Sequence, residues 1–377
     1  MNREKGSFRL TASAICAQLS NINIKKSLLL LFVSLLGVSC NNVKVSGRLK
    51  YDPEPAHIEE VTTLDENRVL ISKIDNLAFA GDTAFFVVTD NKIVQYNWLG
   101  EQTAVIDRRG AGPEEYINID KISTGEKCIY VWCYSTLRLL KYDTAGQFLG
   151  VVAQPEASIK GFGVDEESKT VCFYHPRGGG KIAALYDIQT GKMQPFDSME
   201  FGEEDKLLSV GNANPGVIFA SGKLLFAPYS SQEVYELDLK TGVFSQSETK
   251  GPNDDAFGVE PVSDAASLIN GFSPKLAHYL DENGSTIGIY EGEKGLIMVS
   301  LVGKIEWDSS FQKIEHNDRM CRIYFQDNES ENGWKAMDMP LPLDLTPRFW
   351  AHDGQLFTLL VNTEGTSSTY TLCKVNN

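Results

Sequence analysis

A repeat marked by glycines is the feature of the sequence that most restricts its fold. Four successive stretches each read as an apolar strand, a polar turn, an alternating strand, a tight turn and a further strand. The tight turns close on glycines at intervals of 46, 45 and 51 residues, namely Gly100, Gly146, Gly191 and Gly242. A large apolar anchor precedes each glycine by four or five residues, namely Tyr96, Tyr142, Tyr186 and Leu237. A period near 45 residues with about four short strands per unit is typical of a β-propeller.

The number of units sets the number of blades. Residues 286–310 and 355–377 fit the pattern less closely and bring the count to six, with seven as the alternative. The last unit lacks an outer strand, whereas residues 57–75, ahead of the first unit, contain strand-like runs. We therefore predict an all-β, six-bladed propeller closed by an N-terminal strand, because a blade hides its edges only when the ring closes. A pair of β-sandwiches explains the glycine spacing poorly. Residues 261–280 read as an insertion that holds the one helix.

The amino terminus reads as an export signal. Lys25 and Lys26 precede the apolar run SLLLLFVSLLGVS, which has the length of a signal-peptide core and is short for a membrane span. The run ends in LGVSC, where Cys40 follows the small Ser39, and this resembles the lipobox of bacterial lipoproteins. In that motif the cysteine becomes the lipidated terminus. One departure is Gly37 at the position three before the cysteine, and a plain secretory signal is the alternative.

These boundaries predict three parts. Residues 1–39 form a lipoprotein signal peptide, residues 40–54 form a tether, and residues 55–377 form a single propeller domain. The chain has a formal net charge of −15, and removal of the basic signal segment makes the remainder more acidic. Such a charge disfavours nucleic acid and anionic lipid surfaces as partners. Membrane attachment would come through acyl chains on Cys40 alone.

The remaining cysteines predict no disulfide framework. They contain no CxxC pair, are odd in number and lie in apolar strand-like runs, so we expect buried free thiols. They are Cys128, Cys133, Cys172, Cys321 and Cys373.

The stretch DRRGAGPEEYIN, residues 107–118, lies where the outer strand of the first unit ends and the inner strand of the next begins. It matches neither a P-loop nor a dinucleotide-binding turn, and its two glutamates would repel an anion. We predict an inter-blade structural motif in which glycine and proline shape the turn and the tyrosine packs between blades. Its members are Gly110, Gly112, Pro113, Glu115 and Tyr116. Arg108 and Arg109 keep a smaller functional role as ligand-binding candidates at a channel mouth, where they could donate hydrogen bonds to a carboxylate or sugar.

Taken together, the signal, the six-blade repeat and the RRGAGPEEY block resemble the six-bladed β-propeller lipoproteins of Bacteroidetes. These are TolB-like in fold, and the glycine-rich crossover is similar to that of NHL-type propellers. Typical members carry G-x-G-P-G-E-[YF], whereas this chain has Glu114 where that pattern favours glycine. The resemblance covers most of residues 50–377 and implies an envelope-anchored propeller with no well-defined enzymatic activity.

No local motif predicts catalysis. The five histidines are scattered without HxH or HExxH, and neither a GxSxG elbow nor an EF-hand is present. We assign no catalytic residue, no metal ligand and no cofactor. Propeller lactonases and lyases gather Glu, Asn and Asp around a central Ca²⁺, one residue per blade, which sequence spacing cannot reveal. Among the tryptophans, we expect Trp132 in the core and Trp98 and Trp334 at the surface.

These observations favour an envelope-anchored, non-catalytic module that binds a ligand or protein. Its partner would be an envelope protein, a peptide or a glycan. The alternative is a propeller lyase or lactonase with a divalent metal in the central channel. The segment NNVKVSG after Cys40 lacks an acidic run, which favours a protein that faces the periplasm over one at the cell surface.

Overall fold

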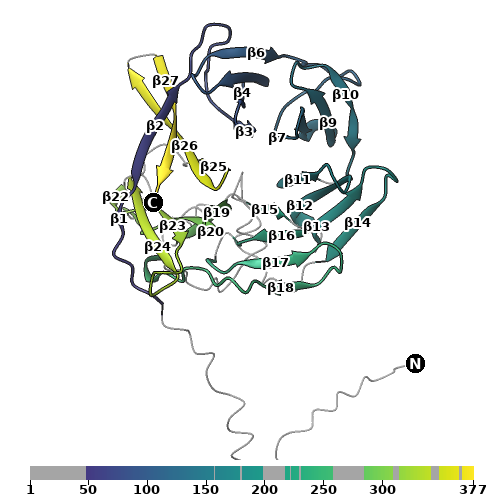
Figure 1. The fold of residues 1–377 in the computed structure, drawn as a ribbon. Coiled ribbons are helices and arrows are strands. Elements are labelled where there is room, and N and C mark those ends of the chain that lie inside the picture. The colour runs from purple at the N-terminus through teal and green to yellow at the C-terminus, as the bar shows by residue number, and fades with distance from the viewer. Residues whose placement is uncertain are drawn as a thin grey trace, which may run out of the picture. The chain divides into compact units, whose positions relative to one another are not determined.

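Six β-sheets follow one another around a central axis in the computed structural model (Figure 1). The structure describes residues 48–156, 158–178, 181–197, 217–220, 222–228, 231–257, 284–308, 314–340, 348–364 and 367–377. The expected signal peptide, Cys40 and the helix expected within 261–280 lie outside the described residues.

The first four blades each consist of four strands that are consecutive in the chain, with the first strand innermost (Figure 1). Blade 1 contains β3 (Asn76–Ala80), β4 (Ala84–Thr89), β5 (Lys92–Asn97) and β6 (Gln102–Ile106). Blade 2 contains β7 (Lys121–Thr124), β8 (Cys128–Cys133), β9 (Arg138–Asp143) and β10 (Phe148–Ala153). Blade 3 contains β11 (Gly161–Asp165), β12 (Thr170–Gly178), β13 (Lys181–Asp187) and β14 (Met193–Asp197). Blade 4 contains β15 (Ile218–Ala220), β16 (Lys223–Phe226), β17 (Tyr235–Asp238) and β18 (Phe244–Gln246).

The last two blades recruit strands from the amino-terminal segment. Blade 5 contains β19 (Ser285–Gly292), β20 (Gly295–Val302), β23 (Met320–Gln326) and β24 (Trp334–Pro340), with the short β1 (Glu54–Pro55) parallel to β24. Blade 6 contains β25 (Phe349–His352), β26 (Gln355–Glu364) and β27 (Ser367–Asn376), and β2 (His57–Thr63) is its outer strand, antiparallel to β27. The N-terminal strand therefore closes the ring, as predicted, and the ring has six blades rather than the alternative seven.

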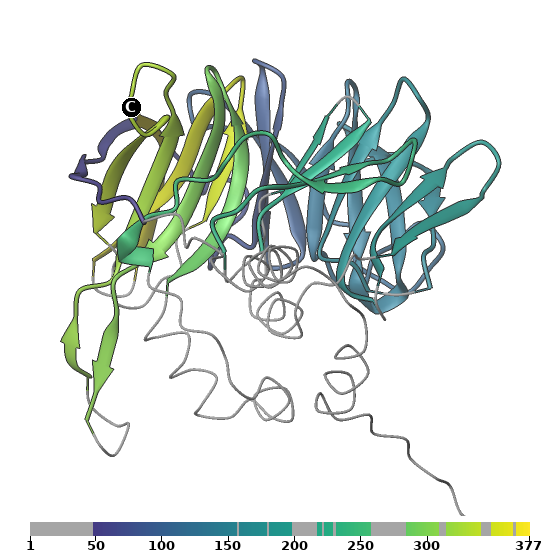
Figure 2. The same cartoon turned by 90° about the horizontal axis from the view of Figure 1, so that it is seen from below.

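One hairpin extends blade 5. Strands β21 (Ile305–Trp307) and β22 (Ile314–Asn317) pair with each other between β20 and β23 and project from one face of the ring (Figure 2). Helical structure in the described residues is limited to two 3-10 turns, η1 (Tyr134–Thr136) and η2 (Asp255–Phe257). Within this part of the chain, no helix is long and apolar enough to cross a membrane.

The second strand of a blade explains why the repeat reads as apolar runs. All six residues of β4, AFFVVT, and all six of β8, CIYVWC, are buried. Each of these strands contributes side chains to the core on both of its faces, so an unbroken apolar run replaces the alternating pattern. The five expected thiols are free and buried, which confirms that reading of the cysteines. Trp132 is fully buried, also as predicted.

The repeat glycines occupy turns that need a left-handed backbone. Gly100, Gly146, Gly191 and Gly242 have φ angles of +78°, +83°, +68° and +73°. Gly100 is also constrained by a close approach, because a Cβ there would lie 2.1 Å from the carbonyl oxygen of Thr63 at the end of β2. The regular spacing of these turns along the chain thus reflects backbone geometry rather than ligand chemistry.

Leu49 belongs to the same compact unit as the propeller strands. The backbone N–H of Leu49 donates to Asn253 O (2.9 Å), and its carbonyl accepts from Asp255 N (2.9 Å). The Tyr51 hydroxyl donates to Pro252 O (2.9 Å), and its ring packs edge-on against Tyr324 with centroids 5.6 Å apart. Residues 49–54, expected as the end of the tether, therefore pack on the propeller.

Candidate binding site on the propeller axis

The crossover motif lies between β6 and β7, where the repeat placed it. The Glu115 side chain folds back over the turn, and its Oε2 accepts a hydrogen bond from Gly112 N (2.8 Å). A Cβ on Gly110 would lie 1.9 Å from that same oxygen, so the carboxylate occupies the space that a side chain at 110 would need. Pro113 O accepts from Arg138 Nη1 (3.2 Å), a residue of blade 2.

Tyr116 joins the two blades that the crossover connects. Its side chain is fully buried, and its hydroxyl donates to Ile106 O (3.0 Å) and accepts from Arg108 N (3.1 Å). The ring packs edge-on against Tyr142 of blade 2, with centroids 6.2 Å apart. Burial raises the pKa of the Tyr116 hydroxyl to about 12. The tyrosine is thus a packed, neutral hydrogen-bonding side chain.

The two arginines that the sequence offered as ligand-binding candidates contact the protein's own backbone. Arg108 Nε donates to Gly146 O (3.2 Å), and Arg109 Nη2 donates to Asp90 O. Neither residue is among those that line the axial cavity formed by the described residues. The two guanidinium groups are therefore engaged with the protein's own backbone and lie outside the lining of the cavity on the propeller axis.

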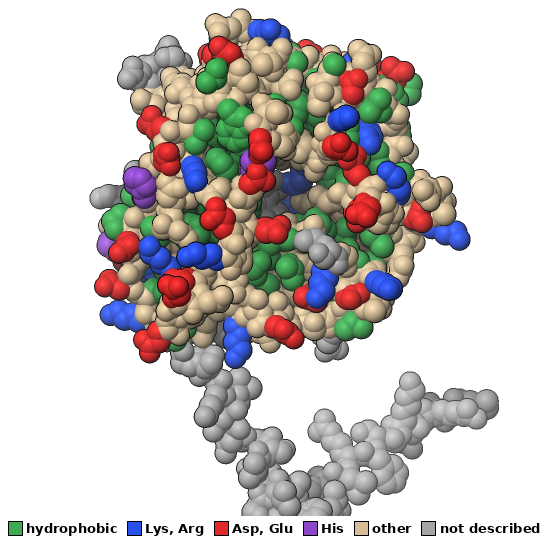
Figure 3. All heavy atoms as spheres, viewed as in Figure 1, with side chains coloured by type: hydrophobic (Ala, Val, Ile, Leu, Met, Phe, Trp, Pro, Cys, Tyr) green, Lys and Arg blue, Asp and Glu red, His purple; other side chains and the backbone are tan. Residues whose placement is uncertain are grey.

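The axial cavity is formed by the innermost strands of all six blades, with a volume of roughly 370 Å³. Figure 3 shows the hollow at the centre of the ring, with a basic side chain visible inside it. Large apolar side chains make much of its wall, among them Phe79, Ile122, Phe162, Tyr290 and Phe349. A cavity of this size with apolar walls and a few polar groups suits a small ligand or the end of a larger one.

Three basic residues gather at the end of the cavity where the inner strands begin. Lys121 is the first residue of β7, and Lys160 and Arg348 directly precede β11 and β25. Lys121 is buried, Lys160 is half-buried and Arg348 is exposed at the rim. Arg348 Nη1 donates to Ile74 O and Asp75 O, both at 2.6 Å, which fixes the guanidinium at the seam between blades 6 and 1.

The pKa of Lys121 reflects its burial and the charges around it. The pKa of its ammonium group is lowered to about 8, chiefly by desolvation; the charge of Asp120 opposes this shift, and the charges of Lys160 and Arg348 add to it. A buried ammonium close to two other cations gains most from a negatively charged partner. The cavity therefore combines apolar walls with a cationic end.

This charge bears on the Ca²⁺ alternative. The cavity lining includes no aspartate or glutamate among the described residues, and its polar residues include Asn76, Ser123, Thr124 and His352. Three cations would repel a divalent metal at the end where they gather. The described residues thus do not assemble the ring of carboxylates that a central Ca²⁺ would use.

Sequence reasoning missed the basic end of the cavity because each blade contributes one residue. Lys121, Lys160 and Arg348 are far apart in the chain, and each by itself reads as an ordinary surface cation beside a strand. A signal does exist in the repeat. Once the blades are superposed, a cation recurs at or just before the first residue of the inner strand in blades 2, 3 and 6.

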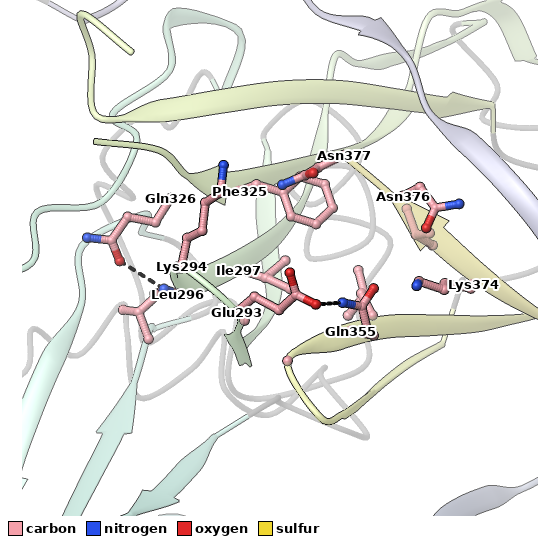
Figure 4. Close-up of a pocket in the computed structure, with 15 residues that line it drawn as sticks. Glu293, Lys294, Leu296, Ile297, Phe325, Gln326, Gln355, Lys374, Asn376 and Asn377 are labelled. Atoms are coloured by element: carbon pink, nitrogen blue, oxygen red, sulfur yellow. Dashed lines mark hydrogen bonds between the residues drawn. The ribbon is translucent and has the colours of Figure 1, made fainter. Parts of the chain in front are cut away.

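Two other hollows lie off the axis. A pocket of about 260 Å³ between blades 5 and 6 is lined by polar and apolar side chains, and some of its polar groups pair within the pocket (Figure 4). Glu293 accepts from Gln355, and Gln326 Oε1 accepts from Leu296 N (2.8 Å). A groove of about 630 Å³ runs between blades 3 and 4, with Glu166 among the residues at its edge. The charged side chains that line each of these hollows are of mixed sign, whereas those of the axial cavity are all positive.

Glu166 belongs to a structural hydrogen-bond cluster. Its Oε1 accepts from the Tyr130 hydroxyl (2.6 Å) and from Lys141 Nζ (3.1 Å), and its Oε2 accepts from Glu126 N (3.0 Å). The hydrogen bond from Tyr130 is the largest cause that lowers the pKa of the Glu166 carboxyl to about 2. Burial raises the pKa of the adjacent Cys128 thiol, so the cluster does not create a reactive thiolate.

One expectation about surface tryptophans was wrong. Trp334 is buried, with 4% of its surface exposed, because it lies in β24 and its indole N–H donates to Lys250 O (3.0 Å). Trp98 is half-buried and stacks on Phe79 with ring centroids 5.7 Å apart.

The fold and sequence have recognisable relatives. A family model described as a six-bladed beta-propeller, DUF5128, matches residues 61–245. A Bacteroides fragilis protein described as exported superposes with a TM-score of 0.60 at 9% identity, over 87% of this chain and 98% of its own. A DUF4221 family member from Bacteroides vulgatus superposes with a TM-score of 0.50 at 10% identity, over 87% of this chain and 96% of its own. Comparison with curated proteins gave no match. Its ring of six sheets makes the chain a six-bladed β-propeller, and residues 61–245 are similar to the DUF5128 family of such propellers.

Proposed function

We propose that this protein is a lipid-anchored binding module of the cell envelope, which holds an acidic ligand in the axial cavity of its propeller. The observation that carries the proposal is the gathering of Lys121, Lys160 and Arg348 at one end of a cavity with apolar walls. The chain has a net charge of −15, so these three residues make a locally positive region in an otherwise negatively charged protein.

The ligand that fits best bears a carboxylate on a compact apolar or sugar body. A carboxylate would neutralise the cationic end, while Phe79, Phe162 and Tyr290 offer flat surfaces to the remainder. Roughly 370 Å³ accommodates one sugar ring or one to two amino-acid residues, so a larger partner would insert one end. An acidic glycan end and the carboxyl end of a peptide share this chemistry.

The proposal also includes a lipid anchor and a location in the cell envelope. Acylation of Cys40 would hold the propeller at the membrane, facing the periplasm, and the fold similarity to an exported Bacteroides protein is in keeping with that address. The test is fractionation of cells that express Cys40→Ala. We expect the variant to leave the membrane fraction after a salt wash, and retention there would contradict lipid anchoring.

Binding is tested by calorimetry with the purified full chain and two matched ligand pairs. The first pair is glucuronate and glucose, and the second is a tripeptide with a free or an amidated carboxyl end. We expect heat from the acidic member of at least one pair, with loss of that signal in Lys160→Gln and Arg348→Gln. Lys127→Gln, which removes an exposed cation outside the cavity, is the control and should bind normally. Equal binding by all three variants would refute a site at the cationic end.

The metal-dependent lyase or lactonase finds less support. It would need a divalent cation at an axis where the described residues bring three positive charges together. The binding module is therefore the function that the geometry favours.

A further inference from the structure

A second group of chemically matched side chains lies at the seam where the ring closes. His352, at the end of β25, comes together with Asp353 of the same turn and with Asp82 of the β3–β4 turn in blade 1. Figure 3 shows a histidine side chain between acidic ones beside the axial hollow. It is the one grouping of three potential metal-ligating side chains that the described part of the chain forms.

The distances match the first coordination shell of a small divalent metal. His352 Nε2 lies 3.6 Å from Asp82 Oδ1 and 3.6 Å from Asp353 Oδ2, and the three ligand atoms all lie within 4.8 Å of one another. Tetrahedral ligands with bonds of about 2.1 Å to zinc are separated by about 3.4 Å. The three atoms therefore need only small side-chain rotations to share one ion.

The imidazole is held in place before any ion arrives. Its ring stacks on Phe79 with centroids 4.8 Å apart and an interplanar angle of 17°, and on Trp98 at 6.0 Å and 23°. Only 15% of the His352 side chain is exposed, whereas the side chains of Asp82 and Asp353 are 86% and 71% exposed. An oriented imidazole beside two adjustable carboxylates is preorganised for coordination.

Charge also favours a cation at this point. Two carboxylates lie close together, and among the described residues the ion-pair partner of both is His352. A neutral imidazole leaves their repulsion uncompensated, while a divalent ion would balance it and use the imidazole as a third ligand.

From this geometry we infer that Asp82, His352 and Asp353 form a binding site for a divalent transition metal, with Zn²⁺ the best fit. The imidazole ligand argues for zinc over Ca²⁺ and Mg²⁺, which prefer oxygen ligands throughout. Three protein ligands leave a fourth position for water or for a ligand group. The ion would clamp the first turn of blade 6 to that of blade 1, across the seam that β2 closes. None of these residues belongs to the cationic end, but His352 also lines the axial cavity, so the metal site adjoins the proposed acidic-ligand site.

The test is a titration of the untagged, metal-free full chain with Zn²⁺, followed by calorimetry and by competition with a chromophoric chelator. We expect one Zn²⁺ per chain, a thermal midpoint that rises with Zn²⁺ concentration, and no displacement by millimolar Ca²⁺. Substitution with Co²⁺ should give the visible absorption of a tetrahedral site with nitrogen and oxygen ligands. Binding should weaken as the pH falls, because protons compete with the ion for its ligand atoms.

Variants of the three proposed ligands, with a control variant, distinguish metal coordination from an ion pair that binds no metal. His352→Gln should abolish the one-to-one binding, and Asp82→Asn should weaken it at least tenfold. Asp353→Asn keeps a residue type that tolerates the φ of +48° at this position. His316→Gln is the control, because His316 lies 3.8 Å from Asp318 but does not belong to the grouping of three potential metal ligands.

Two results would overturn the inference. One is Zn²⁺ binding that His352→Gln and Asp82→Asn leave unchanged. The other is a wild-type chain that binds no Zn²⁺ at neutral pH. Asp82 is exposed on a turn, so Asp82→Asn keeps the test decisive if the histidine variant does not fold.

Discussion

Asp254 and Arg322 form a buried ion pair that fastens the start of the propeller to its fifth blade. Asp254 Oδ2 lies 2.7 Å from Arg322 Nη1 and also accepts from the Tyr324 hydroxyl at 2.7 Å. The carboxylate side chain is fully buried, and the same turn pairs with the backbone of Leu49. Arg322 completes its hydrogen bonds with Asp338, at 2.6 and 2.8 Å.

This network predicts a large effect of Asp254→Asn. The change leaves the Arg322 guanidinium with one carboxylate in place of two in a buried setting, where removal of one partner of an ion pair costs about 3–5 kcal/mol. Urea unfolding should show this loss of unfolding free energy. Glu306→Gln, which removes an exposed partner of Lys304, is the control and should cost less than about 1 kcal/mol. Equal effects of the two changes would mean that the buried pair contributes nothing special.

Gly100 predicts a test of ring closure. Gly100→Ala places a Cβ 2.1 Å from the backbone oxygen of Thr63, so β2 must move or the turn must open. Gly81→Ala is a matched control, since Gly81 also has a positive φ, +54°, but nothing lies within 4 Å of the added Cβ. We expect the control to cost about 1–2 kcal/mol from backbone strain, and Gly100→Ala to cost clearly more. Thermal unfolding of the two variants side by side decides the point.

Gly110 and Glu115 predict a coupling that a double-mutant cycle can measure. Gly110→Ala should push the Glu115 carboxylate away from Gly112 N and remove a charge-assisted hydrogen bond, at about 1.5–3 kcal/mol. Glu115→Ala removes the same bond directly. In the Glu115→Ala background, the Gly110 substitution should therefore cost little. Fully additive losses in chemical denaturation would show that the two positions act separately.

The features of this molecule that the sequence could predict are those whose residues lie close together along the chain. The turn glycines, the buried apolar strands and the crossover at 107–118 each lie within a few residues of their partners. The closing strand β2 was predictable because the last unit visibly lacked one. Lys121, Lys160 and Arg348 gave no local signal, and neither did Asp82 with His352, because each blade brings a single residue to the axis. The burial of Trp334 involves a carbonyl distant in sequence, that of Lys250 in the connection that follows β18.

Glu166 predicts how acid affects the contact of blades 2 and 3. Its folded-state pKa of about 2 lies below the ordinary value of 4.5, so the stabilisation is fully present above pH 4.5 and is lost as the pH falls toward 2. Glu166→Gln should lower stability at pH 7 and flatten the pH dependence between 4.5 and 2. Glu167→Gln, at the exposed neighbouring position, should change neither. Urea midpoints measured across this pH range provide the check, and parallel profiles for wild type and Glu166→Gln would contradict it.

Lys121 predicts the pH dependence of ligand binding on the axis. Its pKa of about 8 means that the cavity loses a positive charge as the pH rises from 7 to 9, well before an ordinary lysine would lose its proton. The affinity for an acidic ligand should therefore fall over this interval, while a neutral analogue should bind equally at both values. Because the bound anion favours the ammonium form, binding near pH 8 should take up protons, and calorimetry in buffers of different ionisation enthalpy measures that uptake. In Lys121→Met the pH dependence should disappear along with the proton uptake. An affinity that stays constant from pH 7 to 9 in the wild-type chain would place the acidic group away from Lys121.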